Sequence, residues 1–303
     1  MHLPRPLVVA FAAPTYRLAL SRRRSVATQR RLTELTAAGL RPPRGTHVEH
    51  VTLGGRPTER VTVGASQRPR AVLYLHGGGY VVGSARMYRA LAGHLARVSG
   101  SVVYSLDYRL APEHRYPAAL EDATAAFHDL VDVHGYGPAR VAIAGDSAGG
   151  GLAVATARVL TDAGRRPAAL GLLSPWTDPG EAATMARDLV INREWGKWCA
   201  EQYRGTAAPN DPGYAPMHGS LDGLPPMLIH TATSELLHDQ ITRFAARARA
   251  ADVDAELVDL PTMWHSGHVL AGLLREATVA VRDVGVFLRT HLDAEDRTLA
   301  PAG

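Results

Sequence analysis

VAIAGDSAGGGLAVA, residues 141–155, joins a short apolar run to an alanine-rich segment through the pattern G-x-S-x-G. This order predicts a strand, a sharp turn and then a helix, with Ser147 at the turn between Gly145 and Gly149. Glycines suit such a turn because side chains there would crowd the neighbouring backbone. The stretch therefore predicts a serine nucleophile at the carboxyl end of a strand, beside a helix N-terminus that favours negative charge.

Similar apolar runs lie on both sides of this stretch. Each is short, rich in β-branched or other apolar residues, and bounded by Gly, Pro or charged residues, which indicates a strand. Continuous apolarity is typical of strands that are buried on both faces, as in a parallel sheet. The predicted strands are residues 71–75, 101–106, 140–145, 169–174 and 226–231.

Helix-period segments separate these runs, which predicts a mostly parallel, doubly wound α/β sheet with helices on both faces. Pro117 suits the first position of one such helix. Residues 47–64 predict an antiparallel hairpin around Gly54-Gly55. The basic, helical residues 1–44 and the polar residues 178–212 interrupt the alternation, and we expect both to cover one edge of the sheet.

Composition favours a soluble protein, since 46% of the 303 residues are hydrophobic and 20% are charged. Cys199 is the only cysteine, which excludes an intrachain disulfide and a CxxC metal site and favours a cytoplasmic location. The apolar run at residues 7–13 stops at Pro14 and is too short to span a bilayer, so we expect no stable membrane insertion.

The formal net charge of +4 raises the question of an acidic partner. The densest basic cluster is SRRRSVATQRR, residues 21–31, which we interpret as a solvated helix face; contact with a membrane surface or a polyanion is the alternative. No aromatic residues are interleaved in this cluster, so we expect no nucleic-acid partner.

Three consecutive glycines follow the strand at residues 71–75, in LYLHGGGYVVGS (73–84). Their spacing does not fit a dinucleotide fingerprint. It fits an oxyanion hole, in which backbone N–H groups of this loop and of Ala148, the residue after the nucleophile, would converge on a developing negative charge. We expect His76 to brace the loop.

A serine nucleophile needs a general base and an acid that orients it. The acid candidates are Glu235 and Asp239 in TSELLHD (233–239), directly after a predicted strand. The base candidates are His265 and His268, of which His265 lies closer to the preceding strand. The alternative for TSELLHD is a Glu/His metal site, but no HExxH-like pair supports it and we expect no metal.

The motifs HGGGY, YRLAPEHRYPAALEDA (108–123), GDSAGG, GLPPMLI and MWH together resemble the hormone-sensitive lipase family of α/β-hydrolase esterases, over about residues 45–292. The resemblance implies an α/β-hydrolase catalytic domain at 45–303, with a helical cap made of segment 1–44 and the inserted region 178–212. It implies that Glu235 completes a triad with Ser147 and His265. By the same resemblance, Gly78, Gly79 and Ala148 are the oxyanion donors. We interpret YRLAPEHRYP (108–117) as a structural loop that props the oxyanion strand and whose charges pair internally.

The function that this resemblance implies is hydrolysis of a small-molecule carboxylic ester by an activated serine, without a cofactor. Small to medium acyl esters or lactones are the expected substrates, with a long-chain lipase, a deacetylase or an amidase as variants. The alternative is a catalytically inactive ligand-binding module of the same fold. A homodimer is left open, as is membrane-surface association through the basic N-terminal segment.

Overall fold

Eight strands form one sheet in the computed structural model, which describes residues 2–64 and 69–298. The strands are β1 (Thr46–Leu53), β2 (Arg56–Val63), β3 (Ala71–Leu75), β4 (Val102–Leu106), β5 (Val141–Asp146), β6 (Leu170–Leu173), β7 (Met227–Thr231) and β8 (Ala255–Asp259). Their order in the sheet is β1-β2-β4-β3-β5-β6-β7-β8. Only the β1–β2 and β2–β4 pairs are antiparallel, so the prediction of a mostly parallel sheet is confirmed.

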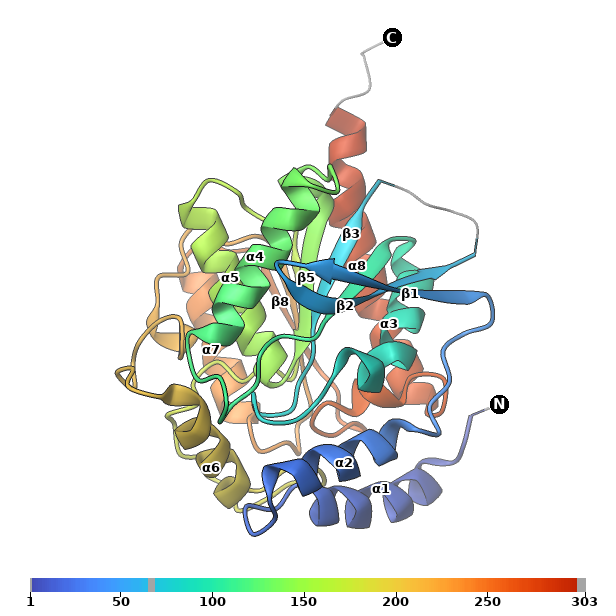
Figure 1. The fold of residues 1–303 in the computed structure, drawn as a ribbon, viewed down its shortest axis with the longest axis vertical. Helices are drawn as coiled ribbons and strands as arrows, with labels where there is room; N and C mark the ends of the chain where they lie inside the picture. Colours follow the sequence, from blue (N-terminus) through green and yellow to red (C-terminus); the bar gives the residue numbers. More distant parts are fainter. Residues whose placement is uncertain (1, 65–68, 299–303) are drawn as a thin grey trace.

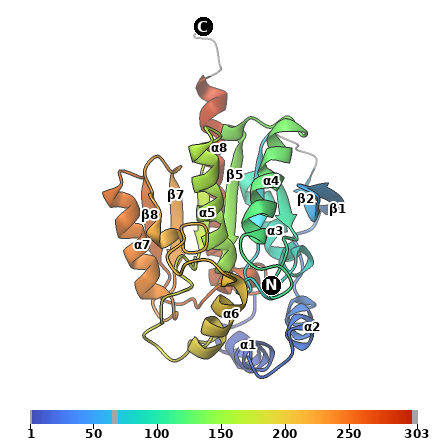
Figure 2. The same ribbon diagram turned by 60° about the vertical axis from the view of Figure 1, so that its left-hand side comes forward.

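Helices cover both faces of this sheet, as Figures 1 and 2 show. The helices are α1 (Arg5–Ala19), α2 (Val26–Ala37), α3 (Ala85–Ser99), α4 (Ala118–Asp132), α5 (Ala148–Asp162), α6 (Arg193–Arg204), α7 (His238–Ala250) and α8 (Arg275–Thr298). The core has one part on each face of the sheet, and successive residues of β3 point into different parts. Leu73 packs in the cluster with α4, α5 and α7, and Val72 packs in the cluster with α3 and α8. This is the period-2 alternation of a strand that is buried on both faces.

The hairpin between β1 and β2 has the predicted turn. Leu53 pairs with Arg56, which leaves Gly54 and Gly55 as a two-residue loop. Both glycines have positive φ, 54° and 73°, and other residues adopt this conformation only with strain.

One helix prediction needs correction. Helix α4 begins at Ala118, and Pro117 is its N-cap instead of its first residue; Pro117 lacks an N–H, so either position leaves the helix hydrogen bonds unchanged. Helix α1 extends past the apolar run and Pro14 to Ala19.

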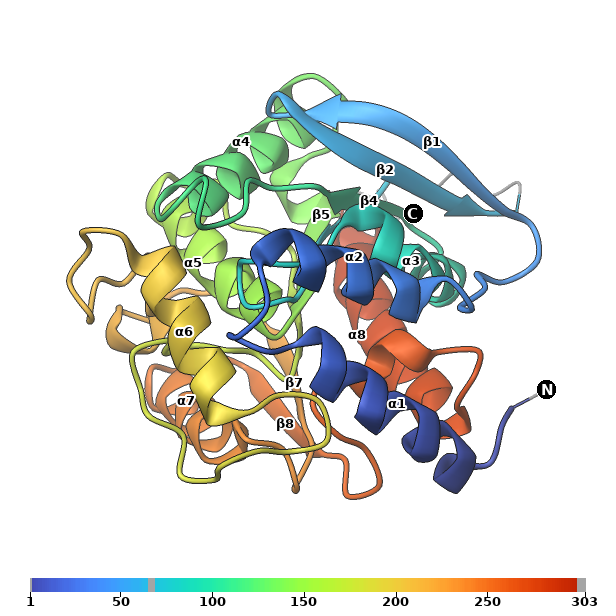
Figure 3. The ribbon, with the colours of Figure 1, turned by 60° about the horizontal axis from the view of Figure 1, so that its bottom comes forward.

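The two segments that interrupt the alternation lie together at the carboxyl edge of the sheet. Figure 3 shows α1, α2 and α6 beside one another at this end of the molecule. Helices α1 and α2 come from segment 1–44, and α6 comes from region 178–212. Strand β5, which is directly followed by Ser147, ends beneath these three helices.

Candidate active site

Ser147 occupies the sharp turn between β5 and α5. Its φ of 50° is a positive value that a non-glycine residue adopts only under constraint. Its backbone N–H is held by the carbonyl of Leu173 at 2.9 Å. At Gly149 an added Cβ would lie 2.0 Å from the carbonyl oxygen of Leu75, so only glycine allows the helix to start this close to β3.

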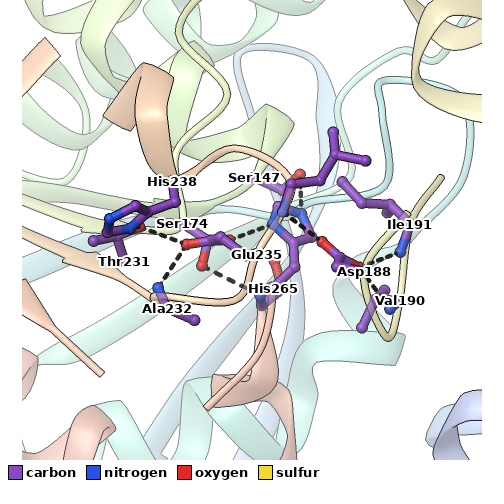
Figure 4. Close-up of polar contacts among 12 residues, drawn as sticks. Ser147, Ser174, Asp188, Val190, Ile191, Thr231, Ala232, Glu235, His238 and His265 are labelled. Carbon is purple, nitrogen blue, oxygen red and sulfur yellow. Dashed lines mark hydrogen bonds and ion pairs between the residues drawn. The ribbon is translucent and has the colours of Figure 1, made fainter. Parts of the chain in front are cut away.

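His265 lies between Ser147 and Glu235 and contacts both (Figure 4). Its Nε2 is 2.9 Å from the Ser147 Oγ, and its Nδ1 is 2.7 Å from Oε2 of Glu235. With the ring proton on Nδ1, where the carboxylate accepts it, Nε2 is free to accept the serine proton. The structure thus brings together three predicted residues that are separated by 118 and 30 positions in the chain.

Glu235 is buried, and hydrogen bonds hold its second oxygen. Oε1 accepts the backbone N–H of Ala232 at 2.7 Å and the hydroxyl of Thr231 at 2.8 Å. The Thr231 hydroxyl in turn lies 3.2 Å from Nδ1 of His238. His238 is therefore linked to the carboxylate by two hydrogen bonds, through the hydroxyl of Thr231 (Figure 4).

The surroundings of His265 change its basicity. Burial lowers the pKa of its imidazole, but the hydrogen bond and negative charge of Glu235, with the charges of Asp188 and Asp146, outweigh burial and raise the pKa above its ordinary value. A raised pKa makes His265 a stronger base toward the Ser147 hydroxyl and stabilises the imidazolium that proton transfer creates.

Asp188 is a residue of the site that the sequence did not predict. Its Oδ1 accepts the backbone N–H groups of Val190 at 2.7 Å and Ile191 at 2.8 Å. Its Oδ2 accepts the N–H of Leu236 at 2.9 Å, which ties region 178–212 to the loop that carries Glu235. No local motif marks Asp188, because Leu236 lies 48 positions further along the chain.

The other base and acid candidates lie elsewhere. His268 does not contact Ser147; its Nε2 is 3.1 Å from Nδ1 of the buried His230 on β7. Burial lowers the pKa of His230 to about 4, and burial with the charges of His230 and His265 holds the pKa of His268 well below its usual range. Asp239 is exposed in the first turn of α7, where its carboxylate accepts from the Thr184 hydroxyl.

The glycine loop after β3 lines the same cavity as Ser147 and His265. Gly78 has a φ of 117°, and a Cβ there would lie 2.1 Å from the carbonyl oxygen of Val82. In the part of the chain that the structure describes, no protein group accepts the N–H of Gly78 or Gly79. Ala148 is the first residue of α5, where a backbone N–H has no partner within the helix.

Buried side chains hold this loop in place. Asp146 accepts the N–H of Gly77 at 2.8 Å and the hydroxyl of Tyr74 at 2.9 Å, and burial raises the pKa of its carboxyl although these hydrogen bonds oppose it. As expected, His76 braces the loop: its Nδ1 lies 2.8 Å from the Gly77 carbonyl, and its ring stacks on Tyr108.

The charges of Arg109 and Glu113, in the segment 108–117, pair with residues outside that segment, contrary to the prediction. Arg109 hydrogen-bonds the carboxylate of Asp122 in α4. Glu113 instead pairs with Arg30 of α2, through two bonds of 2.9 and 2.7 Å. The prediction failed here because Arg30 lies 83 positions away and reaches Glu113 only once α2 covers the edge of the sheet.

Two adjoining cavities meet at Ser147, and both are lined by Gly79, Ile191 and Trp195. The cavity that includes His265 has a volume of about 60 Å³ and is mostly apolar; Tyr16 of α1 contributes to its wall. The other cavity is about 420 Å³ and lies under α6. The site therefore has one narrow and one wide compartment on either side of the serine.

Across residues 2–64 and 69–298, no three His, Cys, Asp or Glu side chains come together as a metal site. Over the same residues, no helix has both the length and the apolar content needed to cross a bilayer.

Comparisons with known proteins point in one direction. A family described as having the alpha/beta hydrolase fold matches residues 72–269. The LipR protein of Mycobacterium tuberculosis is 40% identical over 278 residues, 90% of each chain. An acetyl-hydrolase of Streptomyces hygroscopicus is 39% identical over 253 residues, 78% of this chain and 84% of its own. A solved esterase of the bacterial hormone-sensitive lipase family superposes with a TM-score of 0.89 at 36% identity, covering 96% of this chain and all of its own.

Proposed function

The chain belongs to the hormone-sensitive lipase family of α/β-hydrolase esterases and is an ester hydrolase, and we propose that it cleaves its substrate through an acyl-enzyme on Ser147. The Ser147 oxygen attacks the ester carbonyl while Nε2 of His265 takes the hydroxyl proton. His265 then gives this proton to the departing alcohol, which leaves an acyl group on the serine. Water attacks the carbonyl of the acyl-enzyme while His265 takes the water proton. The bond between the acyl carbon and the Ser147 Oγ then breaks, the carboxylic acid leaves, and His265 gives its proton to the Ser147 Oγ, which restores both residues.

The observation that carries this proposal is the unbroken series of short contacts from Ser147 through His265 to Glu235, at 2.9 and 2.7 Å. Both side chains on which the serine depends are buried, so water does not compete for their hydrogen bonds. Glu235 fixes the tautomer of His265 and stabilises its charged form during each proton transfer.

The backbone of Gly78, Gly79 and Ala148 supplies the proposed oxyanion hole. The N–H groups of the two glycines have no protein acceptor in the described chain, and the N–H of Ala148 stands at a helix N-terminus. Donors that are free in the resting enzyme and already in position stabilise negative charge on the carbonyl oxygen without further reorganisation.

Small to medium acyl esters or lactones are the substrates that we propose. The narrow and wide compartments meet at Ser147, which suits an ester with one compact and one bulkier group. Residues 45–303 form the catalytic domain in this proposal, and segment 1–44 with region 178–212 forms the cap. Tyr16, Val190 and Trp195 belong to these two segments and line the narrow compartment. The name of the Streptomyces relative, an acetyl-hydrolase, agrees with a short acyl group.

The test compares the native chain with Ser147→Ala on a graded series of acyl esters and lactones. We expect a loss of about 10⁵-fold in kcat for the variant, and loss of the native activity with a fluorophosphonate that modifies active serines. Ser220→Ala, which alters an exposed serine, is the matched control and should keep full activity. Unchanged turnover in Ser147→Ala would overturn the mechanism, and inactivity of the native chain across the series would favour the ligand-binding module.

A further inference from the structure

Helix α1 has apolar side chains both on the face that packs against the protein and on an exposed side next to it. One face packs against the body of the protein: Val8 is buried in a cluster with Trp264, Leu270 and Leu274. Further along this face, Tyr16 lines the narrow compartment beside Ser147. The packing of α1 on the enzyme is therefore complete without its other face.

The outer face of α1 exposes a row of large apolar side chains, which we call the α1 stripe. It consists of Leu3, which precedes the helix, and Leu7, Phe11 and Leu18, with exposed fractions of 44, 52, 76 and 50%. Spacings of four and seven residues place Leu7, Phe11 and Leu18 on one side of the helix. A helix that is apolar all round belongs in a protein core or in lipid, and a contiguous exposed apolar patch marks a binding surface.

The charges around the α1 stripe point to the partner. The first 33 residues contain seven arginines and no acidic residue. Arg17 is exposed next to the stripe, and Arg22 and Arg23 are exposed just beyond the helix. The ion pair of Arg22 with Glu194 joins two side chains that are each more than half exposed, which leaves the arginine accessible. An apolar stripe bordered by arginines complements a bilayer with anionic headgroups.

A second copy of the chain fits this surface less well. Two copies that bury their α1 stripes against each other would have to pair the same patch on both subunits. The arginines that border one stripe would then face those of the other, with no acidic residue in the first 33 to offset them. Like charges at such a contact oppose association.

We propose that helix α1 docks the enzyme on an anionic lipid surface, lying in the plane of the interface with Leu7, Phe11 and Leu18 in the boundary between headgroups and acyl chains. Figures 1 and 3 show α1 at the outer margin of the end of the molecule that carries the site. Docking there would hold the cavity behind Tyr16 at the bilayer, where lipophilic esters concentrate. The inference goes beyond the proposed function, because binding needs no catalysis.

Vesicle co-sedimentation of the full chain tests the proposal. One set of vesicles is phosphatidylcholine alone, and the other contains phosphatidylglycerol as well. We expect the native chain to bind the anionic vesicles, more weakly as salt rises. The triple variant Leu7→Gln/Phe11→Gln/Leu18→Gln should bind at least about tenfold more weakly, because it cannot bury apolar area in the interface.

A matched control changes exposed apolar residues away from α1. Val133→Gln/Val159→Gln alters side chains that are 74 and 40% exposed at α4 and α5, and it should bind as the native chain does. Both multiple variants should hydrolyse a water-soluble ester at the native rate, which shows that they are folded.

A direct probe is Phe11→Trp with lipids brominated on their acyl chains, which should quench the fluorescence of the new tryptophan when vesicles are added. Equal binding by the native chain and the triple variant, or equal binding to neutral and anionic vesicles, overturns the proposal. So does a native dimer that the triple variant separates into monomers, because the α1 stripe would then be a subunit interface.

Discussion

The carboxylate of Glu235 and the imidazole of His238 meet at a single hydroxyl, that of Thr231. Because Thr231 gives its proton to Glu235, the imidazole N–H of His238 must donate to the Thr231 oxygen. A short relay therefore supports the acid from outside the site, while His265 binds its other oxygen.

The relay predicts a graded series of losses. Glu235→Gln should lower kcat by about 10⁴-fold, because the amide can no longer stabilise the imidazolium of His265. Thr231→Val should cost about tenfold, the value of one hydrogen bond to a buried charge, and His238→Leu less than that. Steady-state kinetics on one ester measures all three. A loss in His238→Leu as large as that in Glu235→Gln would contradict this order.

A methyl group in the glycine loop should impair the oxyanion site. Gly78→Ala adds a Cβ 2.1 Å from the Val82 carbonyl oxygen and must displace the loop, so we expect kcat to fall about 10²- to 10³-fold, as it does when an oxyanion donor is lost. Gly137→Ala is the control, because a Cβ there meets nothing within 4 Å. Native kcat in Gly78→Ala would place the oxyanion donors elsewhere.

The raised pKa of His265 sets the acid limb of the pH profile. The base must be neutral, so kcat/KM should fall as the pH drops through this pKa, which lies above the ordinary 6.5. Asp188→Asn removes one of the charges that raise it, so the limb should move to lower pH, and further still in Glu235→Gln. Asp222→Asn, at an exposed turn, is the control and should leave the limb in place. A shift toward higher pH in Asp188→Asn would contradict the assignment.

The buried pair His230 and His268 should make stability depend on pH. Burial lowers the pKa of His230 to about 4 from the ordinary 6.5, so between these values the unfolded chain binds a proton that the folded chain excludes. The contribution of the neutral His230 to the free energy of unfolding is fully present above pH 6.5. It is lost as the pH falls toward 4, which lowers the free energy of unfolding by up to about 3 kcal/mol.

Urea unfolding at a series of pH values measures this effect. His230→Leu/His268→Leu should flatten the decline in the free energy of unfolding between pH 6.5 and 4.5, whereas His50→Gln, at an exposed position, should not. An equally steep decline in the double variant would show that other groups cause it.

The sequence was informative wherever a local pattern determines local geometry. The run from 141 to 155 specified β5, the turn and α5, because G-x-S-x-G is itself a requirement of that turn. The alternation of strands and helices predicted the mostly parallel sheet with helices on both faces, but not the order of its strands. Glu235 and His265 could be predicted as candidates because both follow Ser147 in the chain and each comes after a predicted strand. The stretch TSELLHD by itself also suggested a metal site.

Interactions between distant segments could not be predicted from the sequence. Asp188 reaches Leu236, and Arg30 reaches Glu113, only after the N-terminal segment and region 178–212 have been placed over the sheet. The contact of His238 with Thr231 could not be predicted for the same reason, since it depends on where the hydroxyl of Thr231 points and not on the neighbours of His238 in the chain.

The contacts of α1 also bear on how the chain folds during synthesis. The backbone N–H of Leu3 binds the carbonyl of Leu273, and the Arg5 side chain binds the carbonyl of Thr262, 257 positions away. Helix α1 is synthesised before the surface on which it packs, because that surface includes residues as late in the chain as Leu274 and Ala277. Until those residues have emerged from the ribosome, the apolar side chains of α1 are open to chaperones or to a nearby bilayer.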